Sequence, residues 1–316
     1  MARFSRSVGW LGLALVLAGV SNVSAAEPAS CRTPRFSDVG WTDITATTAI
    51  ATRLLEGLGY KPKVQVLSVP VTYSSMKNKD IDVFLGNWMP TMEADRKPYV
   101  DGKSVEVLGA NLDGAKYTLA VPKYLHDQGL KDFKDIAGFA KQLSGKIYGI
   151  EPGNDGNRLI IDMMKADKFG LKPFEIVESS EQGMLAQVER AVKRKEPIVF
   201  LGWEPHPMNT KFAIAYLTGG DEVFGPNLGG ATIYTNTRAG YVSECPNVGA
   251  FIKNLKFSLG LENTVMGSIL FDNMEAQKAA ETWLKANPKD WEPWLAGVTT
   301  VDGKPGLEAV RKSLKL

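Results

Sequence analysis

Three tryptophans stand where apolar runs of strand length end, and residues of this type at such positions could form a binding site. Trp203 follows the run PIVFLG, Trp88 follows DVFLGN, and Trp41 follows FSDVG. In open α/β sheets, ligands bind beyond the carboxyl ends of the strands. Three indole rings at such ends therefore predict an aromatic pocket. A pocket of this kind suits a quaternary ammonium ion, which has no N–H to donate and is held by the quadrupoles of the rings.

The segments around the first two tryptophans predict alternating strands and helices. Residues 42–57 are expected to form a helix that Thr42 or Asp43 caps and that Gly57 or Gly59 ends. Because this segment is rich in Thr, which forms helices poorly, tertiary packing must hold it. A β-α-β-α-β order of this kind implies a parallel sheet. The elements that follow are a strand at 63–69, a helix at 72–77 and a strand at 82–86.

The pattern restarts in the middle of the chain, which indicates two α/β units. Strands are predicted at 105–108 and 116–121, with a turn or crossing point at 111–114 between them. The unit that follows is predicted to be inserted in the first, so that two crossings join two lobes around a cleft able to close on a ligand. Further helices are predicted at 133–143, 157–165, 181–194, 247–257, 261–272 and 275–287, and further strands at 146–150, 174–177, 197–202, 212–217 and 231–235. The predicted parts are a signal peptide at 1–25, a first lobe at 26–112 and 211–316, and a second lobe at 113–210.

The N-terminus and the composition predict an exported globular protein. Arg3 and Arg6 precede an apolar stretch at 8–20 that is short for a membrane span, and small residues offer cleavage after Ala25. A retained membrane anchor is the alternative. Without residues 1–25 the chain carries 35 basic and 35 acidic residues, so its charge does not indicate nucleic acid or an anionic membrane as a partner. The hydrophobic content of 44% is typical of globular domains.

The two cysteines of the chain, Cys31 and Cys245, are expected to form a disulfide, since isolated pairs in exported proteins are most simply paired. The bond would bring the start of the mature chain to a segment beyond the inserted lobe. Lipid attachment at Cys31 is the competing interpretation. It is disfavoured because residues 28–30 lack the Leu that such a site usually carries, and because the cleavage signal lies upstream. The protein is therefore expected to diffuse freely in an oxidising compartment.

Four motifs together resemble a known family: residues 40–43 (GWTD), 80–88 (DIDVFLGNW), 148–153 (YGIEPG) and 202–206 (GWEPH). The chain resembles the periplasmic substrate-binding proteins of ABC importers for quaternary ammonium compounds, and among them it is most similar to choline-binding members. The resemblance covers essentially the whole mature chain. It implies the two-lobed α/β periplasmic binding protein fold, with the second lobe inserted in the first and the ligand cleft between them. It also implies delivery of the ligand to a membrane permease driven by an ATPase.

The resemblance also implies a set of ligand-binding residues. The aromatic box would consist of Trp41 and Trp88 from the first lobe and Tyr117 and Trp203 from the second. Asp43 and the pair Asn154 and Asp155 would contact the polar end of the ligand or add negative field. The positions at strand ends indicate the three tryptophans independently, whereas Tyr117 and Asn154 rest on the resemblance alone.

Each of these residues also has a purely structural interpretation. A tryptophan buries well anywhere in a core. Asp43 could serve only as a helix N-cap, and the sequence Asn154-Asp155-Gly156-Asn157 is typical of a turn and a helix cap. His206, between two prolines, is interpreted as a hydrogen-bonded residue that fixes the loop after Trp203. The tryptophans of the C-terminal region, Trp283, Trp291 and Trp294, are expected to pack against the first lobe.

The acidic residues favour choline among the quaternary ammonium ligands. Asp43 and Asp155 can accept a hydrogen bond from a hydroxyl group and attract a net positive charge. They would repel the carboxylate of glycine betaine or proline betaine, and no basic residue lies beside the aromatic motifs. Acetylcholine has the same cationic head as choline and is a further candidate ligand. A betaine-binding protein of the same class is the alternative.

An enzyme and a metal-binding protein are the alternatives from other classes. An enzyme that processes choline esters would need a nucleophile with a base, or a cofactor fingerprint, and the sequence contains no Gly-x-Ser-x-Gly elbow or Gly-rich phosphate loop. A metal site would need a ligand cluster with recognisable spacing, and His206 with scattered acids does not make one. The chain is therefore expected to have no catalytic residue, no cofactor and no metal, and nothing in it demands more than a monomer.

Overall fold

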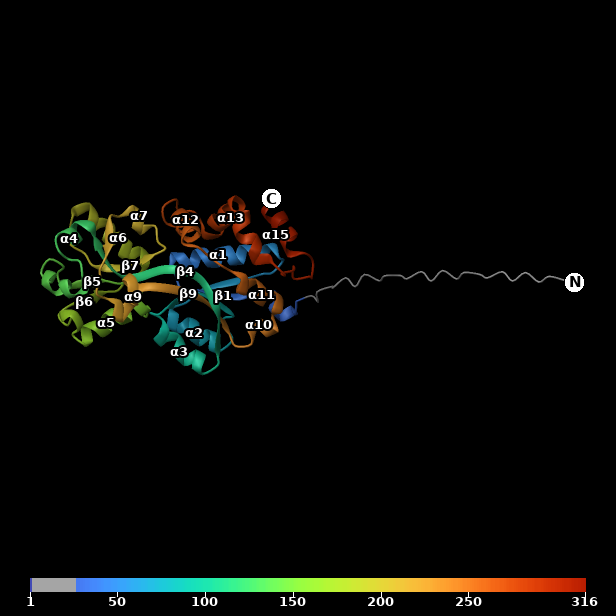
Figure 1. Cartoon of the computed structure of the whole chain (residues 1–316), viewed down its shortest axis with the longest axis horizontal. Coiled ribbons are helices and arrows are strands. Elements are labelled where there is room, and N and C mark those ends of the chain that lie inside the picture. Colours follow the sequence, from blue (N-terminus) through green and yellow to red (C-terminus); the bar gives the residue numbers. More distant parts are fainter. Residues whose placement is uncertain (2–26) are drawn as a thin grey trace.

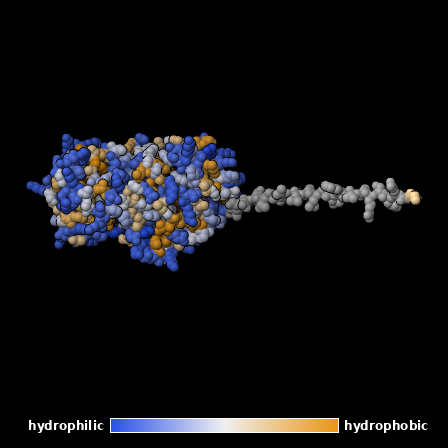
Figure 2. All heavy atoms as spheres, in the orientation of Figure 1, coloured by the Kyte–Doolittle hydropathy of each residue, from blue (hydrophilic) through white to orange (hydrophobic). Residues whose placement is uncertain are grey.

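A computed structural model describes Met1 and residues 27–316 of the chain. Of the predicted signal peptide at 1–25, residues 2–25 lie outside the described residues. Figure 1 shows two lobes side by side, with long strands that run from one lobe into the other. The face in Figure 2 is mostly hydrophilic, with apolar residues scattered over it. Within the described part of the chain, no helix is both long and apolar enough to cross a membrane.

One mixed sheet of nine strands extends through both lobes, in the order β2-β1-β3-β9-β4-β7-β5-β6, with β8 beside β4. Strands β1, β2 and β3 at one end pair in parallel, as do β5, β6 and β7 at the other end. The central ladders that involve β4 and β9 are antiparallel. The strands are β1 (Arg35–Asp38), β2 (Lys63–Val66), β3 (Val83–Met89), β4 (Val105–Pro122), β5 (Lys146–Tyr148), β6 (Glu175–Val177), β7 (Phe200–Glu204), β8 (Ile214–Tyr216) and β9 (Gly230–Arg238).

Strand β4 joins the two ends of the sheet and corrects a prediction. It pairs with β9 from Val105 to Lys116 and with β7 from Lys116 to Ala120. The sequence predicted two strands with a turn or crossing point at 111–114, but the structure has one strand of 18 residues that passes from one lobe to the other without a turn. Three register shifts against β9 lie between Val107 and Ala115. Such bulges bend a ladder without ending it, so Gly and Asn here mark a bend and not a turn.

Helices cover both faces of the first end of the sheet. In Figure 1, α1, α12 and α13 lie on one side of the sheet and α2 and α3 on the other. The three C-terminal tryptophans are buried among these helices, as predicted. The helices are η1 (Ala29–Arg32), α1 (Thr42–Gly57), α2 (Val69–Lys77), α3 (Glu93–Asp101), α10 (Tyr241–Glu244), α11 (Pro246–Asn254), α12 (Leu259–Leu270), α13 (Ala276–Ala286), α14 (Pro288–Trp291), η4 (Glu292–Leu295) and α15 (Gly306–Leu314).

Helix α1 is the Thr-rich segment that was expected to depend on packing, and it is buried along most of its length against α12, α13 and α15. Most of its threonines are buried with it, and Thr45 is half-buried. Thr47 donates to the carbonyl of Asp43 at 3.0 Å, and Thr52 donates to the carbonyl of Thr48 at 2.7 Å. These bonds satisfy hydroxyl groups that would otherwise cost free energy in the core.

The second lobe contains the remaining strands and shorter helices. Residues 133–143 were predicted to form an α-helix, but a 3₁₀ helix ends there at Phe139. Gly138 near its end weakens a continuous α-helix, because Gly has a low helix propensity. The helices are α4 (Lys123–Asp127), η2 (Phe133–Phe139), α5 (Asp155–Lys165), η3 (Lys168–Gly170), α6 (Glu181–Arg194) and α7 (Met208–Lys211), followed by α8 (Asp221–Phe224) and α9 (Pro226–Gly229) before β9.

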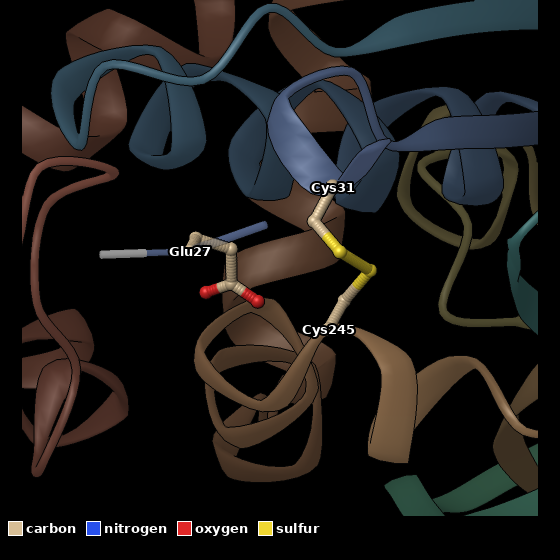
Figure 3. Close-up of side chains that lie close together, drawn as sticks. All are labelled: Glu27, Cys31 and Cys245. Carbon is tan, nitrogen blue, oxygen red and sulfur yellow. A yellow bond between two sulfur atoms is a disulfide. The ribbon is translucent and has the colours of Figure 1, made fainter. Parts of the chain in front are cut away.

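The predicted disulfide between Cys31 and Cys245 is present, with 5.5 Å between the Cα atoms and a sequence separation of 214 residues. Figure 3 shows the Glu27 carboxyl beside it. Glu27 accepts hydrogen bonds from the Tyr60 hydroxyl at 3.0 Å and the Asn247 N–H at 3.2 Å. The side chains of Glu27, Cys31 and Cys245 are close enough to share an ion. Disulfide-bonded sulfurs are not thiolates, however, so we interpret the cluster as structural: it attaches residues 27–31 to residues 245–247.

We predict that replacing both cysteines by Ala lowers the free energy of unfolding by about 2–4 kcal/mol, because the unfolded chain regains the freedom that a long closed loop removes. Urea denaturation measures this loss. Wild-type protein with a reducing agent is the matched control and should show a similar loss. Equal urea midpoints for the double variant and the oxidised wild type would contradict the prediction.

Candidate ligand-binding site

A cavity of about 260 Å³ lies between residues of the two lobes, and it contains all seven of the predicted ligand-binding residues. The first lobe contributes residues from the start of α1 and from β3. The second contributes residues from β4, β7 and the start of α5. Ile150 lines the cavity as well and was not predicted. The lining residues are Trp41, Asp43, Trp88, Tyr117, Ile150, Asn154, Asp155 and Trp203.

The sheet places the aromatic rings next to one another. Tyr117 of β4 and Trp203 of β7 are directly opposite partners in an antiparallel ladder, so their side chains project to the same face. Their ring centroids are 6.2 Å apart, and those of Trp88 and Tyr117 are 5.9 Å apart. Trp41 follows β1 and directly precedes α1. The rings of all four residues are at least nine-tenths buried.

Carboxyl groups orient two of these rings. The indole N–H of Trp88 donates to Asp43 Oδ2 at 3.1 Å, and the indole N–H of Trp41 donates to Glu151 Oε1 at 2.7 Å. A buried indole N–H needs a partner, and each of these has one from the protein. Glu151, which follows β5 in the other lobe from Trp41, was not predicted as a site residue.

Tyr117 is fixed by Asn154 and by two glycines. Its hydroxyl donates to Asn154 Oδ1 at 2.9 Å. A Cβ atom at Gly156 would lie 2.0 Å from that hydroxyl, and one at Gly229 would lie 1.9 Å from the Tyr117 carbonyl oxygen. Only glycine therefore fits at these two positions while Tyr117 keeps its place.

Asn154 caps a helix as predicted, but Asp43 does not. Asn154 is the N-cap of α5, where its Oδ1 accepts from the Asn157 N–H at 3.1 Å, so it has both a structural role and a place in the cavity. The cap prediction for α1 is wrong. Trp41 occupies the N-cap position without a side-chain hydrogen bond, and the Thr42 N–H donates to Glu181 of α6 at 2.7 Å. Asp43 points to Trp88 instead.

Two carboxylate oxygens in the cavity wall stand out. Among the described residues, none provides a hydrogen-bond partner for Asp43 Oδ1 or Asp155 Oδ2, although both atoms are buried. The eight described lining residues include no Lys or Arg. Buried acceptors without partners are costly, so the cavity is suited to a ligand that brings positive charge and a hydrogen-bond donor.

The pKa values of several acids in and around the cavity are raised, because burial makes their charged forms costly. Burial raises the pKa of Asp43 to about 8, and the nearby Glu181 carboxyl adds to the rise. Burial likewise raises the pKa of Glu151 to about 7 and that of Asp155 to about 6. Glu262 of α12 lies near Asp43, and burial raises its pKa well above the ordinary value. A cation in the cavity would favour the charged forms and lower all these pKa values.

His206 has the structural role that the sequence suggested. Its Nδ1 accepts from the Met208 N–H at 2.9 Å, and its Nε2 lies 3.1 Å from Glu181 Oε1. Its ring packs against Trp203, with 4.7 Å between the centroids. The role of Glu181 was not predicted, because its partners Thr42 and His206 are distant in sequence and no motif connects them.

Comparison with known proteins identifies the family. The substrate-binding domain of the ABC-type glycine betaine transport system matches residues 35–286. The chain belongs to this family. The resemblance to substrate-binding proteins of ABC importers is thereby confirmed, and proteins of this family serve importers at the extracytoplasmic side of the membrane.

Solved structures and a curated relative agree with this assignment. An ABC-transporter choline-binding protein in complex with choline is 67% identical, with a TM-score of 0.90 over 91% of this chain and 100% of that one. A choline-binding protein in an unliganded, semi-closed conformation is 66% identical, with a TM-score of 0.84 and the same coverage. A glycine betaine/carnitine transport binding protein of Listeria monocytogenes is 32% identical over 163 residues, 52% of this chain and 53% of that protein. The two-lobed periplasmic binding protein fold is confirmed.

We predict that the ligand-free protein loses stability as the pH rises, because of Asp43. A folded-state pKa raised above the unfolded value gives stability that is complete below pH ~4 and is lost as the pH rises through ~8. Between pH 5.5 and 8.5, wild type should lose about 1–3 kcal/mol more free energy of unfolding than Asp43→Asn. Urea denaturation at both pH values measures this difference.

The control for this experiment is Asp80→Asn, which removes an exposed carboxyl. Its pH dependence should match that of wild type. If Asp43→Asn has the same pH dependence as wild type too, the Asp43 carboxyl is not the group that titrates.

Proposed function

We propose that this chain is an extracytoplasmic solute-binding protein that captures choline in the aromatic cavity by hinge closure and delivers it to the permease of an ABC importer. The observation that carries the proposal is the pair of buried oxygens, Asp43 Oδ1 and Asp155 Oδ2, without partners among the described residues and surrounded by four aromatic rings.

The two ends of choline match these two features of the cavity. Its trimethylammonium group has no N–H and is attracted to the faces of Trp and Tyr rings. Its hydroxyl group is a hydrogen-bond donor for a carboxylate oxygen that lacks one. Its net positive charge favours the ionised forms of the buried acids, which burial disfavours.

Glycine betaine is the second candidate, and the description of the family and the relative from Listeria favour it. Its ammonium group would suit the same rings. Its carboxylate, however, would lie in a cavity whose polar groups are chiefly Asp43, Asp155 and Asn154. A second negative charge there would raise the pKa values of both acids further, so the cavity disfavours it relative to a cation. Acetylcholine keeps the positive charge but has no hydroxyl donor, so it should bind more weakly than choline.

The remaining parts of the proposal concern the whole protein. Of the described residues, 27–112 and 230–316 form the first lobe and 113–229 the second, because β8, α8 and α9 pack against second-lobe elements. The predicted boundary at 210 therefore moves to 229, and strands β4 and β9 connect the lobes as the hinge. The signal peptide at 1–25 directs the chain to the periplasm, where it acts as a monomer without a lipid anchor. The protein has no catalytic function, cofactor or metal, and its partners are the permease and ATPase of the importer.

The experiment that tests the function is a calorimetric titration of protein refolded after removal of bound ligand. Choline should bind at least ~10-fold more tightly than glycine betaine, because opposite and like charges meet the same acids. Tighter binding of glycine betaine would overturn the choice of ligand while leaving the cage. Binding of neither compound would contradict the function.

We predict that the aromatic face of Trp203, and not merely its volume, holds the ligand. Trp203→Leu should weaken choline binding by about 1–2 kcal/mol or more, whereas Trp203→Phe, the matched control, should lose less because it keeps a ring. The same titration measures both variants, and a thermal melt verifies that both fold. Equal losses for Leu and Phe would argue against a cation–π contribution.

A further inference from the structure

Glu181, at the start of α6, occupies a position that the cavity itself does not explain. Its carboxyl group is fully buried. Oε2 accepts from the Thr42 N–H at 2.7 Å, and Oε1 accepts from the Thr42 hydroxyl at 2.6 Å. The carboxyl group therefore replaces the side-chain cap that α1 lacks at its own N-terminus.

His206 holds this carboxyl group from its own lobe. Because His206 Nδ1 accepts from the Met208 N–H, the proton of the neutral ring is on Nε2, which donates to Glu181 Oε1 at 3.1 Å. Glu181 thus receives three hydrogen bonds, two from Thr42 and one from His206. The histidine comes from the loop after β7, in the same lobe as Glu181. It therefore orients Glu181 also when the lobes are open and α1 is not in contact.

The bonds to Thr42 cross from one lobe to the other. Helix α1 lies in the first lobe and α6 in the second, as Figure 1 shows. The neighbouring bond from Trp41 to Glu151 also crosses between the lobes. Two adjacent first-lobe residues, one of them a wall of the cavity, are therefore held by two carboxyl groups of the second lobe. A hinge opening of a few ångströms would break all three bonds, since hydrogen bonds weaken steeply with distance.

We infer that Glu181 is a positioning residue for ligand capture: when the lobes close, it caps α1, fixes Trp41 and Thr42 as the wall of the cavity, and slows ligand release. This inference rests on the proposed function for its ligand, but not for the closure itself. Glu181 reaches the cavity lining through Thr42 and its neighbour Trp41, and through His206, which packs against Trp203. Its charge also contributes to the raised pKa of Asp43.

A purely structural role for Glu181 makes a different prediction. If Glu181 only stabilised the second lobe through His206, its loss would lower the unfolding temperature without changing closure or release. The distinguishing measurements are therefore the rate of ligand release and the distance between the lobes.

The first measurement is the rate of choline release by stopped-flow tryptophan fluorescence. Glu181→Gln places an NH₂ donor where three donors converge, so release should be about 10-fold faster or more. Thr42→Val removes one of the two bonds between Thr42 and Glu181 and should accelerate release about 3-fold or more. Combined, the two substitutions should have less effect than the product of the single ones, because they break the same contact.

Two matched controls accompany these variants. Thr48→Val makes the same change as Thr42→Val on the same helix, at a buried hydroxyl for which the described residues provide no partner. Glu189→Gln makes the same change as Glu181→Gln on the same helix, at a half-buried residue paired with Lys193 and Lys211 of the same lobe. Both controls should release choline at the wild-type rate.

The second measurement needs no ligand. Spin labels on cysteines introduced at exposed Lys77 of α2 and Lys165 of α5 report the distance between the lobes, and the native disulfide leaves no free cysteine in the described chain to interfere. In ligand-free protein, Glu181→Gln should shift the distances to longer values, and Glu189→Gln should not.

Unchanged release and unchanged distances in Glu181→Gln would overturn the inference. If the distances shift but wild-type protein does not bind choline, closure by Glu181 stands and the proposed function fails. If choline binds and only the unfolding temperature of Glu181→Gln falls, the function stands and Glu181 has only a structural role.

Discussion

The structure depends on one electrostatic constraint, the burial of carboxyl groups in an aromatic cavity without a basic residue in its described lining. Asp43 and Asp155 each keep an oxygen without a partner among the described residues, and burial raises the pKa values of both. An ionised carboxylate in such surroundings is costly unless positive charge accompanies it. A quaternary ammonium ligand supplies that charge without displacing any hydrogen bond of the rings. Because it offsets the cost of burying ionised carboxylates, the cavity prefers cations.

The aromatic and acidic residues of the cavity come from both lobes. Trp41, Trp88 and Asp43 come from the first lobe, whereas Tyr117, Trp203 and Asp155 come from the second. Neither set surrounds a ligand alone, so closure of the lobes and completion of the cavity are the same event. Strand β4 serves both purposes, because it pairs with β9 in one part and places Tyr117 opposite Trp203 of β7 in the other.

The parts of the site that the sequence could predict are those that local pattern determines. Apolar runs that end at Trp41, Trp88 and Trp203 indicate strand ends, and parallel strands bring such ends together. Tyr117 and Asn154 carry no such pattern and were predicted only from the family resemblance. Glu151 and Glu181 could not be predicted, because their partners lie 110 and 139 residues away in sequence. Strand β4 was divided wrongly, since bulges and turns share the same Gly and Asn residues.

The central claim is that the positive charge of the bound ligand stabilises the ionised forms of the buried acids. Calorimetric titration with choline at pH 7, in two buffers with different heats of ionisation, counts the protons exchanged on binding. With the pKa of Asp43 near 8 and that of Glu151 near 7 before binding, the account predicts that binding releases protons, because the cation lowers both values. Identical binding heats in the two buffers would show that no proton is exchanged and would contradict the account.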